Sequence, residues 1–517
     1  MSTFSLLLKG SGLRTLESVV SIVLGLLTLP LMMRFLGVDL YGVWVLIGSF
    51  TGLLYIFDLG FASAVTRHMA DAIGQKNSHR MNQIINNALL VYIGLALLIL
   101  LVVTVLSLTL KPNLNGVLTQ EAFAQILWLF GAALAIEFPV KAFSGVATGY
   151  LRYDLLSIYR IIIRIISVSI LVALLFSGFQ LVAIAALNAV MGVISAVAYA
   201  RVAKYLFKDF ALSKRYFSLA VVKEIYRYSL WAFLVDMNQL IKSRMDIFVV
   251  GAQLTLGAVS IYYVAVRLVE YVSELLYKML NLATPLLTQH NAKDDERAFR
   301  EDLLLFTRIN VYFSLLVFIG WIIAGELIIY LWMGSDFDFR LAYQVLLILL
   351  LGRLAGVMVS GLTSALYAKS IHKYLAQIAL FETLLSGGLF ALLWFAKSIG
   401  MIDEINLLTI AWAMTLPLLI GRGLLIPWIT LLKAKITQPL DFLRLSIRPF
   451  CLSPLAVAWW LGLHHENVDI TVHLPWLVLA AVLSLLLVVL VLRWELLPRE
   501  KLLVVRFLRK SKIFIAN

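Results

Sequence analysis

The sequence predicts an all-α polytopic membrane protein with about fourteen transmembrane helices: two pseudo-symmetric six-helix bundles plus two C-terminal helices, with both termini cytoplasmic. Of its 517 residues, 62% are hydrophobic and 14% are charged. Soluble domains have about 45–50% apolar and about 25% charged residues. Runs of about 20 apolar residues, long enough to cross a bilayer as a helix, recur along the whole chain. Basic residues also gather in alternate loops, as they do in multi-pass membrane proteins.

The hydropathy pattern gives the order and approximate bounds of the predicted helices. The spans are 13–34, 41–64, 84–108, 122–148, 157–177, 180–203, 228–251, 258–284, 309–332, 342–366, 374–396, 406–430, 446–463 and 475–493. Lys9 and Arg14 precede an apolar stretch, and no small-residue cleavage site follows it, so we expect the first segment to be retained as an anchor.

Counting Lys and Arg in alternate loops orients the chain. One side of the membrane receives thirty basic residues, and the other receives four: Arg34, Lys111, Arg340 and Lys397. Because basic loops stay on the cytoplasmic side, both termini are expected there. The same bias accounts for most of the net charge of +14, so no nucleic-acid partner is needed to explain it. The loops on the outer side run to about a dozen residues at most, which leaves no room for a soluble catalytic domain.

The chain divides at a stretch with seven basic residues, 201–227, between the sixth and seventh spans. The first hairpin, "FLGVDLYGVW", has a loose counterpart in "VVGAQLTLGAVSIYY" at 249–263, which suggests a parallel repeat. The predicted domains are an N-terminal six-helix bundle (1–207), a basic cytoplasmic linker (208–223), a C-terminal six-helix bundle (224–435), helices thirteen and fourteen (436–495) and a basic cytoplasmic tail (496–517).

Four charged residues form a stripe on the span 258–284. Arg267, Glu270, Glu274 and Lys278 are spaced by three, four and four residues and therefore share a narrow helical arc. One interpretation is a ladder of two internal ion pairs, Arg267–Glu270 and Glu274–Lys278. We favour a cavity-lining role, because ionisable groups inside a membrane are costly and usually functional. The two neighbouring glutamates also make a proton site a candidate here.

The stretch "LIKSRMDIFVV" places three charges inside the seventh span. A charge at mid-bilayer costs at least about 2.5–3.5 kcal/mol. Lys242 and Asp246 are four residues apart and can pair on one helix face. Arg244 points about 200° away from them. Its side chain either reaches the outer interface, pairs with an acid on a neighbouring helix, or binds an anion.

Other spans carry similar polar faces. On the first span, Arg14 and Glu17 share a face with small and hydroxyl residues, and Asp58 ends a face on the second. Hydroxyl stripes alone often only join helices, but the charges favour a hydrated face. Weaker polar faces occur on the fourth span (Glu137, Lys141, Ser144, Thr148) and on the tenth (Arg353, Ser360, Ser364, Tyr367). Glu382 and Arg422 are isolated charges, and charges of this kind are more often capped or paired for structural reasons.

These observations predict a water-filled cavity between two bundles, with cations suited to a phosphate or diphosphate headgroup. The candidate substrate-binding residues are Arg14, Lys242, Arg244, Arg267, Lys278 and Arg353. The candidate ion-coupling residues are Glu17, Asp58, Asp246, Glu270 and Glu274. No phosphate-binding glycine loop and no metal-ligand spacing is present, and Cys451 is the single cysteine, so we expect no catalytic residues, metal or cofactor.

Two regions resemble a known family. "LTLPLMMRFLGVDLYGVW", followed by "FDLGFASAVTR" and a basic polar loop, is similar to the N-terminal pattern of the bacterial polysaccharide transporter family, and "VGAQLTLGAVSIYYVAVRL" resembles its seventh-to-eighth hairpin. That family, which includes O-antigen repeat-unit flippases, shares a superfamily with multidrug and toxin extruders and lipid II flippases.

The resemblance implies a flippase without catalytic chemistry. Such a protein moves a polyprenyl-diphosphate oligosaccharide from the inner to the outer leaflet of the bacterial cytoplasmic membrane by alternating access. The cations on matching helices would then contact the diphosphate: Arg14, Lys242, Arg244 and Arg267. Gly37 and Gly42, with Arg34 and Tyr41 beside them, are expected to be hairpin and packing residues.

The expected partners are a lipid-linked oligosaccharide, membrane lipids, H⁺ or Na⁺ as a coupling ion, and other polysaccharide-assembly proteins. Two alternatives stay open. A multidrug or organic-cation antiporter of the same superfamily would have a cavity dominated by acids, whereas basic residues here at least equal them. A membrane polysaccharide polymerase or ligase would need catalytic outer loops longer than those of this chain.

Overall fold

The computed structural model describes residues 3–58, 60–110, 114, 116–280, 283–433, 439–448, 450 and 482, with the side chains of 3–9, 11, 227–236, 279 and 280 outside that description. Every regular element within these ranges is helical, which confirms the all-α class. Eleven helical segments in this part of the chain are long and apolar enough to cross a membrane.

The chain separates into two compact units, Met1–Ser260 and Ile261–Asn517. The domain boundaries, the bundle symmetry and the side of the membrane on which the termini lie stay predictions.

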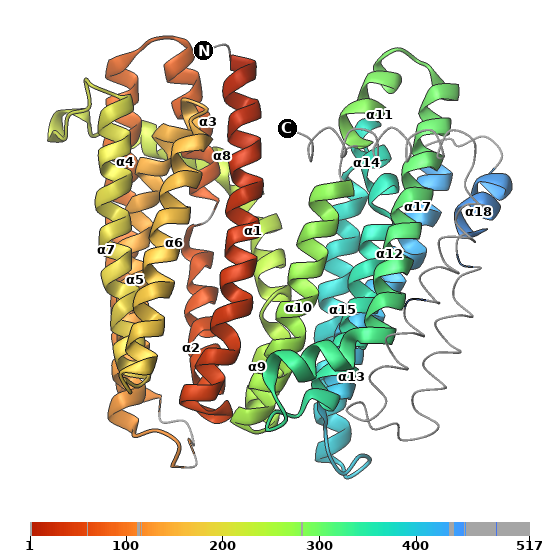
Figure 1. Ribbon diagram of the computed structural model, residues 1–517. Coiled ribbons are helices and arrows are strands. Elements are labelled where there is room, and N and C mark those ends of the chain that lie inside the picture. Colours follow the sequence, from red (N-terminus) through yellow and green to blue (C-terminus); the bar gives the residue numbers. More distant parts are fainter. Residues whose placement is uncertain are drawn as a thin grey trace. The chain divides into compact units, whose positions relative to one another are not determined.

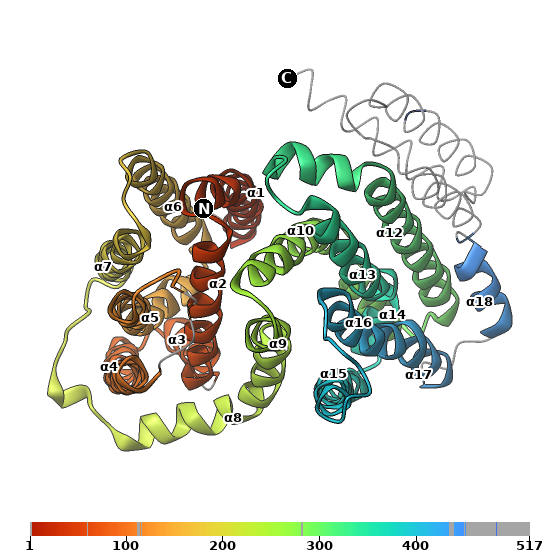
Figure 2. The same cartoon turned by 90° about the horizontal axis from the view of Figure 1, so that it is seen from below.

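The first unit is built around long helices that lie side by side (Figures 1 and 2). Phe61, Tyr92 and Phe138 are buried at its centre. Its elements are α1 (Thr3–Leu36), α2 (Val38–Leu53), the 3₁₀ turn η1 (Leu54–Asp58), α3 (Phe61–Gly74), α4 (Ser78–Thr109), α5 (Gln120–Gly149), α6 (Tyr153–Phe176), α7 (Leu181–Leu206), the 3₁₀ turn η2 (Lys214–Tyr216), α8 (Leu219–Lys242) and α9 (Met245–Gln253).

Two spans predicted as single helices are broken. The predicted span 41–64 stops being α-helical at Leu53, continues as η1, and turns at Gly60, whose φ of +70° is accessible to glycine. Within the predicted span 228–251, α8 ends at Lys242 and α9 begins after Arg244, whose φ of −128° is not helical. A single helical wheel drawn across either break therefore gives wrong relative directions for the side chains on its two sides.

The hairpin glycines act in turns and close packing, as predicted. Gly37 has a φ of +86° and joins α1 to α2. A Cβ on Gly42 would overlap the carbonyl of Leu256, at the start of α10 (Leu256–Leu280). Ser260 in the same turn donates a hydrogen bond from Oγ to the Val38 carbonyl at 2.5 Å.

Three asparagines of α4 hold the linker that follows α7. Each side-chain amide makes two hydrogen bonds to the linker backbone: Asn82 to Asp209 and Ala211, Asn86 to Ala211 and Ser213, and Asn87 to Tyr216 and Ser218, at 2.9–3.1 Å. Asn82 and Asn87 are buried. Because each amide supplies one donor and one acceptor, these residues satisfy linker groups that a helix or sheet would otherwise pair.

The second unit packs α12 against α13 and α13 against α16, as the end-on view shows (Figure 2). It contains α10 from Ile261 onward, α11 (Ala283–Ala292), α12 (Glu296–Met333), α13 (Phe339–Met358), α14 (Ser360–Ala368), α15 (Lys373–Ser398), α16 (Leu407–Leu418), the π-helix η3 (Leu419–Leu425), α17 (Ile426–Lys433) and α18 (Pro439–Ile447).

The first twelve predicted spans all fall on described helices. The thirteenth and fourteenth, 446–463 and 475–493, lie almost entirely outside the described residues, as do the C-terminal tail and Cys451. The total of fourteen spans stays a prediction.

Candidate functional site

A cavity of about 960 Å³ opens within the first unit. Helices α1, α2, α5, α6 and α7 form its wall, with η1 and the α8–α9 junction. Its polar lining residues are Glu17, Ser21, Thr51, Tyr55, Glu137, Lys141, Ser144, Arg160, Arg164, Ser167, Asn188, Ser195, Tyr199 and Arg244.

One side of the cavity holds a network joining α1, α6 and α7. Arg160 donates from Nε to the Tyr199 hydroxyl at 2.8 Å and pairs with Glu17 at 3.4 Å. Ser157 donates to the other carboxylate oxygen of Glu17 at 2.6 Å. Arg160 therefore has two protein partners and serves first to fix Glu17 and Tyr199 in place.

A second network joins α5 to η1 and α4. Lys141 pairs with Asp58 at 3.2 Å, and the Tyr92 hydroxyl donates to the same carboxylate at 3.0 Å. Tyr55 donates a hydrogen bond to Glu137. The Lys141 ammonium also lies 4.8 Å from the centre of the Tyr55 ring, within range of a cation–π interaction.

Two arginines of the cavity differ from the others in having no acidic partner within the described part of the chain. Arg164 lies on α6 one turn beyond Arg160 and is exposed to the cavity. Arg244 lies at the α8–α9 break, against Gly52, where an added Cβ would be 3.5 Å from Nε. The Nε of Arg244 is buried without a hydrogen-bond partner among the described residues.

The balance of charge in the lining favours an anion. Four cationic side chains and two carboxylates line the cavity, counted over its described residues. A buried guanidinium nitrogen without a partner costs free energy that a bound acceptor can recover. Because guanidinium groups bind phosphates in a bidentate manner, the cavity can hold a phosphate-bearing ligand.

The predicted site residues of the first unit separate into those that line this cavity and those that do not. Glu17 and Arg244 line it, and Asp58 contacts it through Lys141. Arg14 instead lies with its guanidinium 3.5 Å from the centre of the Tyr153 ring. Lys242 ends α8, and Asp246 is buried in the first turn of α9, so the two flank the helix break.

The predicted residues of the second unit form local pairs. Arg267 bonds Glu270 at 2.8 Å and the Tyr263 hydroxyl at 2.6 Å, and Lys278 bonds Glu274 at 2.6 Å. Both pairs of the ladder interpretation are therefore present. Arg353 lies on α13 and is not among the residues that line the described cavities. A role of these five residues in binding or coupling stays a prediction.

Arg160, Arg164 and Tyr199 line the cavity but were not predicted from the sequence, and Glu137 and Lys141 were predicted as part of a weaker polar face. The signal for α6 was present in "SIYRIIIRIIS", where Ser157, Arg160, Arg164 and Ser167 recur at helical spacing. The surrounding isoleucines made this segment look like an ordinary lipid-facing span.

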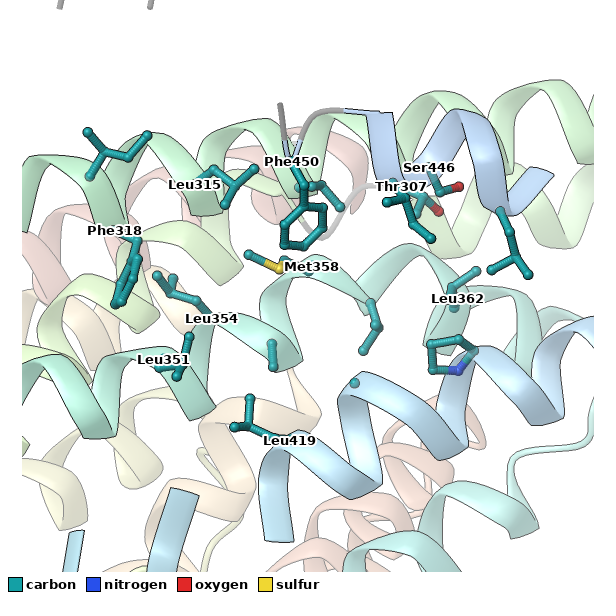
Figure 3. Close-up of a pocket in the computed structure, with 18 of the residues that line it drawn as sticks. Thr307, Leu315, Phe318, Leu351, Leu354, Met358, Leu362, Leu419, Ser446 and Phe450 are labelled. Carbon is teal, nitrogen blue, oxygen red and sulfur yellow. The ribbon is translucent and has the colours of Figure 1, made fainter. Parts of the chain in front are cut away.

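A second cavity, of about 640 Å³, lies within the second unit and has almost entirely apolar walls. Figure 3 shows Leu315 and Phe318 of α12 opposite Leu351 and Leu354 of α13, with Leu419 of η3 below them. Within the described residues, no group of three or more His, Cys, Asp or Glu side chains is placed to hold a metal ion.

Solved structures with the same fold come from transporters. The lipid II flippase MurJ, in an inward closed conformation, aligns with a TM-score of 0.67 at 16% identity, over 93% of this chain and 98% of that one. An inward-facing multidrug resistance MATE family transporter of the MOP superfamily gives 0.57 at 14% identity, over 80% and 98%. A MOP superfamily transporter from Pyrococcus furiosus gives 0.51 at 14% identity, over 84% and 95%.

These likenesses establish a polytopic MurJ- and MATE-like fold, and the proteins concerned are described as transporters or a flippase rather than as enzymes. Comparison with curated protein sequences gives no significant match. The sequence model of one family, described as polysaccharide biosynthesis protein, matches residues 7–290, more than half of the chain. This chain is thus a multi-pass membrane protein that belongs to the polysaccharide biosynthesis protein family.

Proposed function

We propose that this protein is a flippase that moves a lipid-linked oligosaccharide repeat unit, carried on a polyprenyl diphosphate, from the cytoplasmic to the outer leaflet by alternating access. It would act in the bacterial cytoplasmic membrane during surface polysaccharide synthesis. The family and the MurJ-like fold support transport of a lipid-linked sugar. The cavity of the first unit supports an anionic headgroup as the part that is bound.

The observation that carries the proposal is the pair of arginines without acidic partners in one cavity. Arg164 and Arg244 face the same space, and Arg244 has a buried Nε without a hydrogen-bond partner among the described residues. A diphosphate offers several oxygens that two guanidinium groups can bind at once. An organic cation would instead have to approach four cationic groups, which is unfavourable.

The remaining polar lining suits a sugar. Asn188, Ser195 and Ser167 come from α6 and α7 and present amide and hydroxyl groups to the cavity. These groups can donate to and accept from sugar hydroxyls. A volume near 960 Å³ is at the upper end of small-molecule pockets, which leaves space for a diphosphate with its first sugars.

Within this proposal the other predicted cations, Arg14, Lys242, Arg267, Lys278 and Arg353, are secondary contacts. Glu17 and Asp58 remain coupling candidates for H⁺ or Na⁺, because each carboxylate belongs to an ion pair at or beside the cavity. Glu270 and Glu274, which belong to ion pairs on α10, and Asp246, which is buried at the start of α9, also remain coupling candidates.

The test is outward movement of a fluorescent short-chain polyprenyl-diphosphate oligosaccharide in liposomes containing the purified protein. The wild type and Arg34→Ala, which changes an exposed arginine in the last turn of α1, are expected to transport alike. Arg164→Ala and Arg244→Ala are expected to transport poorly. Absence of transport by the wild type, together with export of an organic cation, would move the protein to the antiporter alternative.

A further inference from the structure

The linker between α7 and α8, residues 207–218, lies on the outer side of α4. Figure 2 shows it, in yellow-green, passing around that helix on its way from α7 to α8, and Figure 1 shows it near the end of the unit where α4 begins. The hydrogen bonds from Asn82, Asn86 and Asn87 fix its backbone in that position. The linker is therefore a restrained segment on the outside of the first unit.

The sequence of α4 gives the depth at which the linker is held. Residues 88–109 contain no charged side chain and, at 1.5 Å per residue, extend over about 33 Å, which matches the hydrocarbon core of a bilayer at about 30 Å. The first turns of α4 are polar, and they carry the three asparagines. These turns, and the linker bound to them, are thus expected at the depth of the lipid headgroups.

The large apolar and aromatic side chains of residues 205–219 fall into two sets. One set, which includes Phe207 and Tyr216, is buried. The other set is at least half exposed and consists of Tyr205 (70%), Leu212 (68%), Phe217 (50%) and Leu219 (58%). Leucine, phenylalanine and tyrosine exposed at headgroup depth are typical of segments that lie in the membrane–water interface.

Exposed cations alternate with these apolar side chains along the chain. They are Lys204, Lys208, Lys214, Arg215 and Lys223. Among the described residues, the ammonium groups of the four lysines have no ion-pair or hydrogen-bond partner. Each of them is therefore available to an anion from outside the unit.

The acidic residues of the same stretch are already bound by helices of the first unit. Asp209 accepts a hydrogen bond from the Ser78 hydroxyl at 2.9 Å. Glu224 pairs with Arg80 of α4 at 2.5 Å and lies 3.5 Å from His68 of α3. The outward face of the linker is consequently cationic as well as apolar.

This combination identifies the kind of partner. An acidic soluble protein would neutralise the lysines but would not require apolar side chains at headgroup depth. A neutral lipid surface would accept the apolar side chains and leave the lysines without counter-ions. A phospholipid with net negative charge supplies both a phosphate for the cations and acyl chains for the leucines and the phenylalanine.

We infer that the linker is a docking surface for acidic phospholipids of the leaflet beside it. Lys208 and Lys214 contact the phosphates, and Leu212 and Phe217 between them in sequence enter the upper part of the acyl-chain region. The surface lies outside the cavity of the first unit, so this inference goes beyond the proposed function and does not depend on it.

The first test measures thermal unfolding of the full-length protein in detergent while phosphatidylglycerol or phosphatidylcholine is added. A lipid that binds the folded protein raises the unfolding temperature as its concentration increases. We expect a larger increase with phosphatidylglycerol than with phosphatidylcholine, and we expect high salt to reduce the difference. K208Q/K214Q should lose most of that difference.

The matched control, K293Q/R297Q, makes the same change in charge at the turn between α11 and α12. Both of its residues are exposed, and Asp294 and Asp295 lie beside them. This variant is expected to respond to phosphatidylglycerol as the wild type does. Unfolding of both variants without added phospholipid separates a defect in folding from a loss of lipid binding.

The second test locates the apolar side chains. Leu212→Cys, in a background with Cys451→Ser, is labelled with a small fluorophore, and the protein is placed in nanodiscs that contain phosphatidylglycerol and lipids brominated on their acyl chains. Bromine quenches the label over a short range, so we expect strong quenching at position 212. A label introduced by Lys293→Cys is the control and should be quenched little.

Three results would overturn the inference. The first is a response of K208Q/K214Q to phosphatidylglycerol equal to that of the wild type, and the second is a wild type without preference for this lipid. The third is a label at position 212 as weakly quenched as the one at 293, which would make the linker a surface for an acidic soluble partner instead. None of these measurements uses the lipid-linked sugar, so failure here and failure of the proposed function are observed separately.

Discussion

The two units of this protein contain cavities of opposite character. The cavity of the first unit is lined by charged, hydroxyl and amide side chains, and two of its arginines have no acidic partner among the described residues. The cavity of the second unit is lined mainly by Leu, Ile, Phe and Val side chains. Charges in the second unit lie elsewhere, in pairs such as Arg267–Glu270 and Arg422–Glu382.

The difference teaches how to separate structural from functional charges inside a membrane. An ionisable side chain there needs either a partner or access to water. Paired charges can be purely structural, and the two ion pairs on α10 have the geometry that such a role requires. A cation that has neither an acidic partner nor a saturated set of hydrogen bonds is better evidence for a ligand, and Arg244 fits that description.

The largest effect is expected at Arg244. Arg244→Ala removes charge-assisted hydrogen bonds to the headgroup, each of which contributes about 1.5–3 kcal/mol, so transport at limiting substrate should fall by roughly 10- to 100-fold. The measurement is the initial flux of the labelled lipid-linked sugar, with Arg34→Ala as the control. Flux equal to wild type would mean that the cavity of the first unit is not the headgroup site.

The next effect is on stability, at Lys141. Lys141→Met leaves the partly buried Asp58 without its ion pair to Lys141 but with its hydrogen bond from Tyr92, and should lower the free energy of unfolding by about 2–3 kcal/mol. Thermal unfolding in detergent measures the change, with Lys204→Met, an exposed residue at the end of α7, as the control.

The double variant D58N/K141M should regain most of that loss, because no unpaired charge remains. A double variant as unstable as the single one would show that packing of the lysine stem, rather than the ion pair, is what matters.

A smaller effect is expected where α4 holds the linker. Asn87→Ala removes two hydrogen bonds to the linker backbone, worth about 1–3 kcal/mol together, and should speed tryptic cleavage after Lys214 and Arg215. Gln83→Ala, one turn earlier on the same helix, is the matched control. Equal cleavage rates in both variants would argue that the asparagines do not restrain the linker.

The smallest effect is expected at Arg267. Its partners Glu270 and Tyr263 lie on the same helix, and such a half-exposed pair contributes about 0.2–1 kcal/mol before solvent screening. Arg267→Ala should therefore keep flux within about fivefold of wild type. A loss as large as that of Arg244→Ala would restore the α10 stripe as a binding surface and weaken the contrast between the units.

Hydropathy alone predicted the fold class and located twelve described spans. It could not predict the breaks at Leu53 and Ser243, because local φ angles at Gly60 and Arg244 depend on neighbours in space. The π-helix had a readable signal in its two prolines and two glycines. Its consequence, a pairing of Glu382 with Arg422, required knowing that α15 lies beside η3.

The candidate site was only partly predictable for a related reason. Glu17 and Arg244 were identified from their own segments, but which charges share a cavity depends on how helices pack. Arg160 and Arg164 lie among isoleucines, of which Ile163 also lines the cavity, so their segment looks apolar unless the spacing of its polar residues is examined. The α10 stripe had the strongest periodicity in the sequence, and its pairs satisfy each other locally.

The most direct measurement of the central claim is calorimetric titration of the purified protein with a short-chain polyprenyl-diphosphate sugar. Two matched double variants are compared with wild type: R164A/R244A in the cavity of the first unit, and R267A/K278A on α10. We predict that the first pair weakens binding by roughly 100-fold or more, from two lost charge-assisted contacts, while the second pair changes it by less than about fivefold. The reverse order, or equal binding in all three proteins, would contradict the assignment of the headgroup to the first unit.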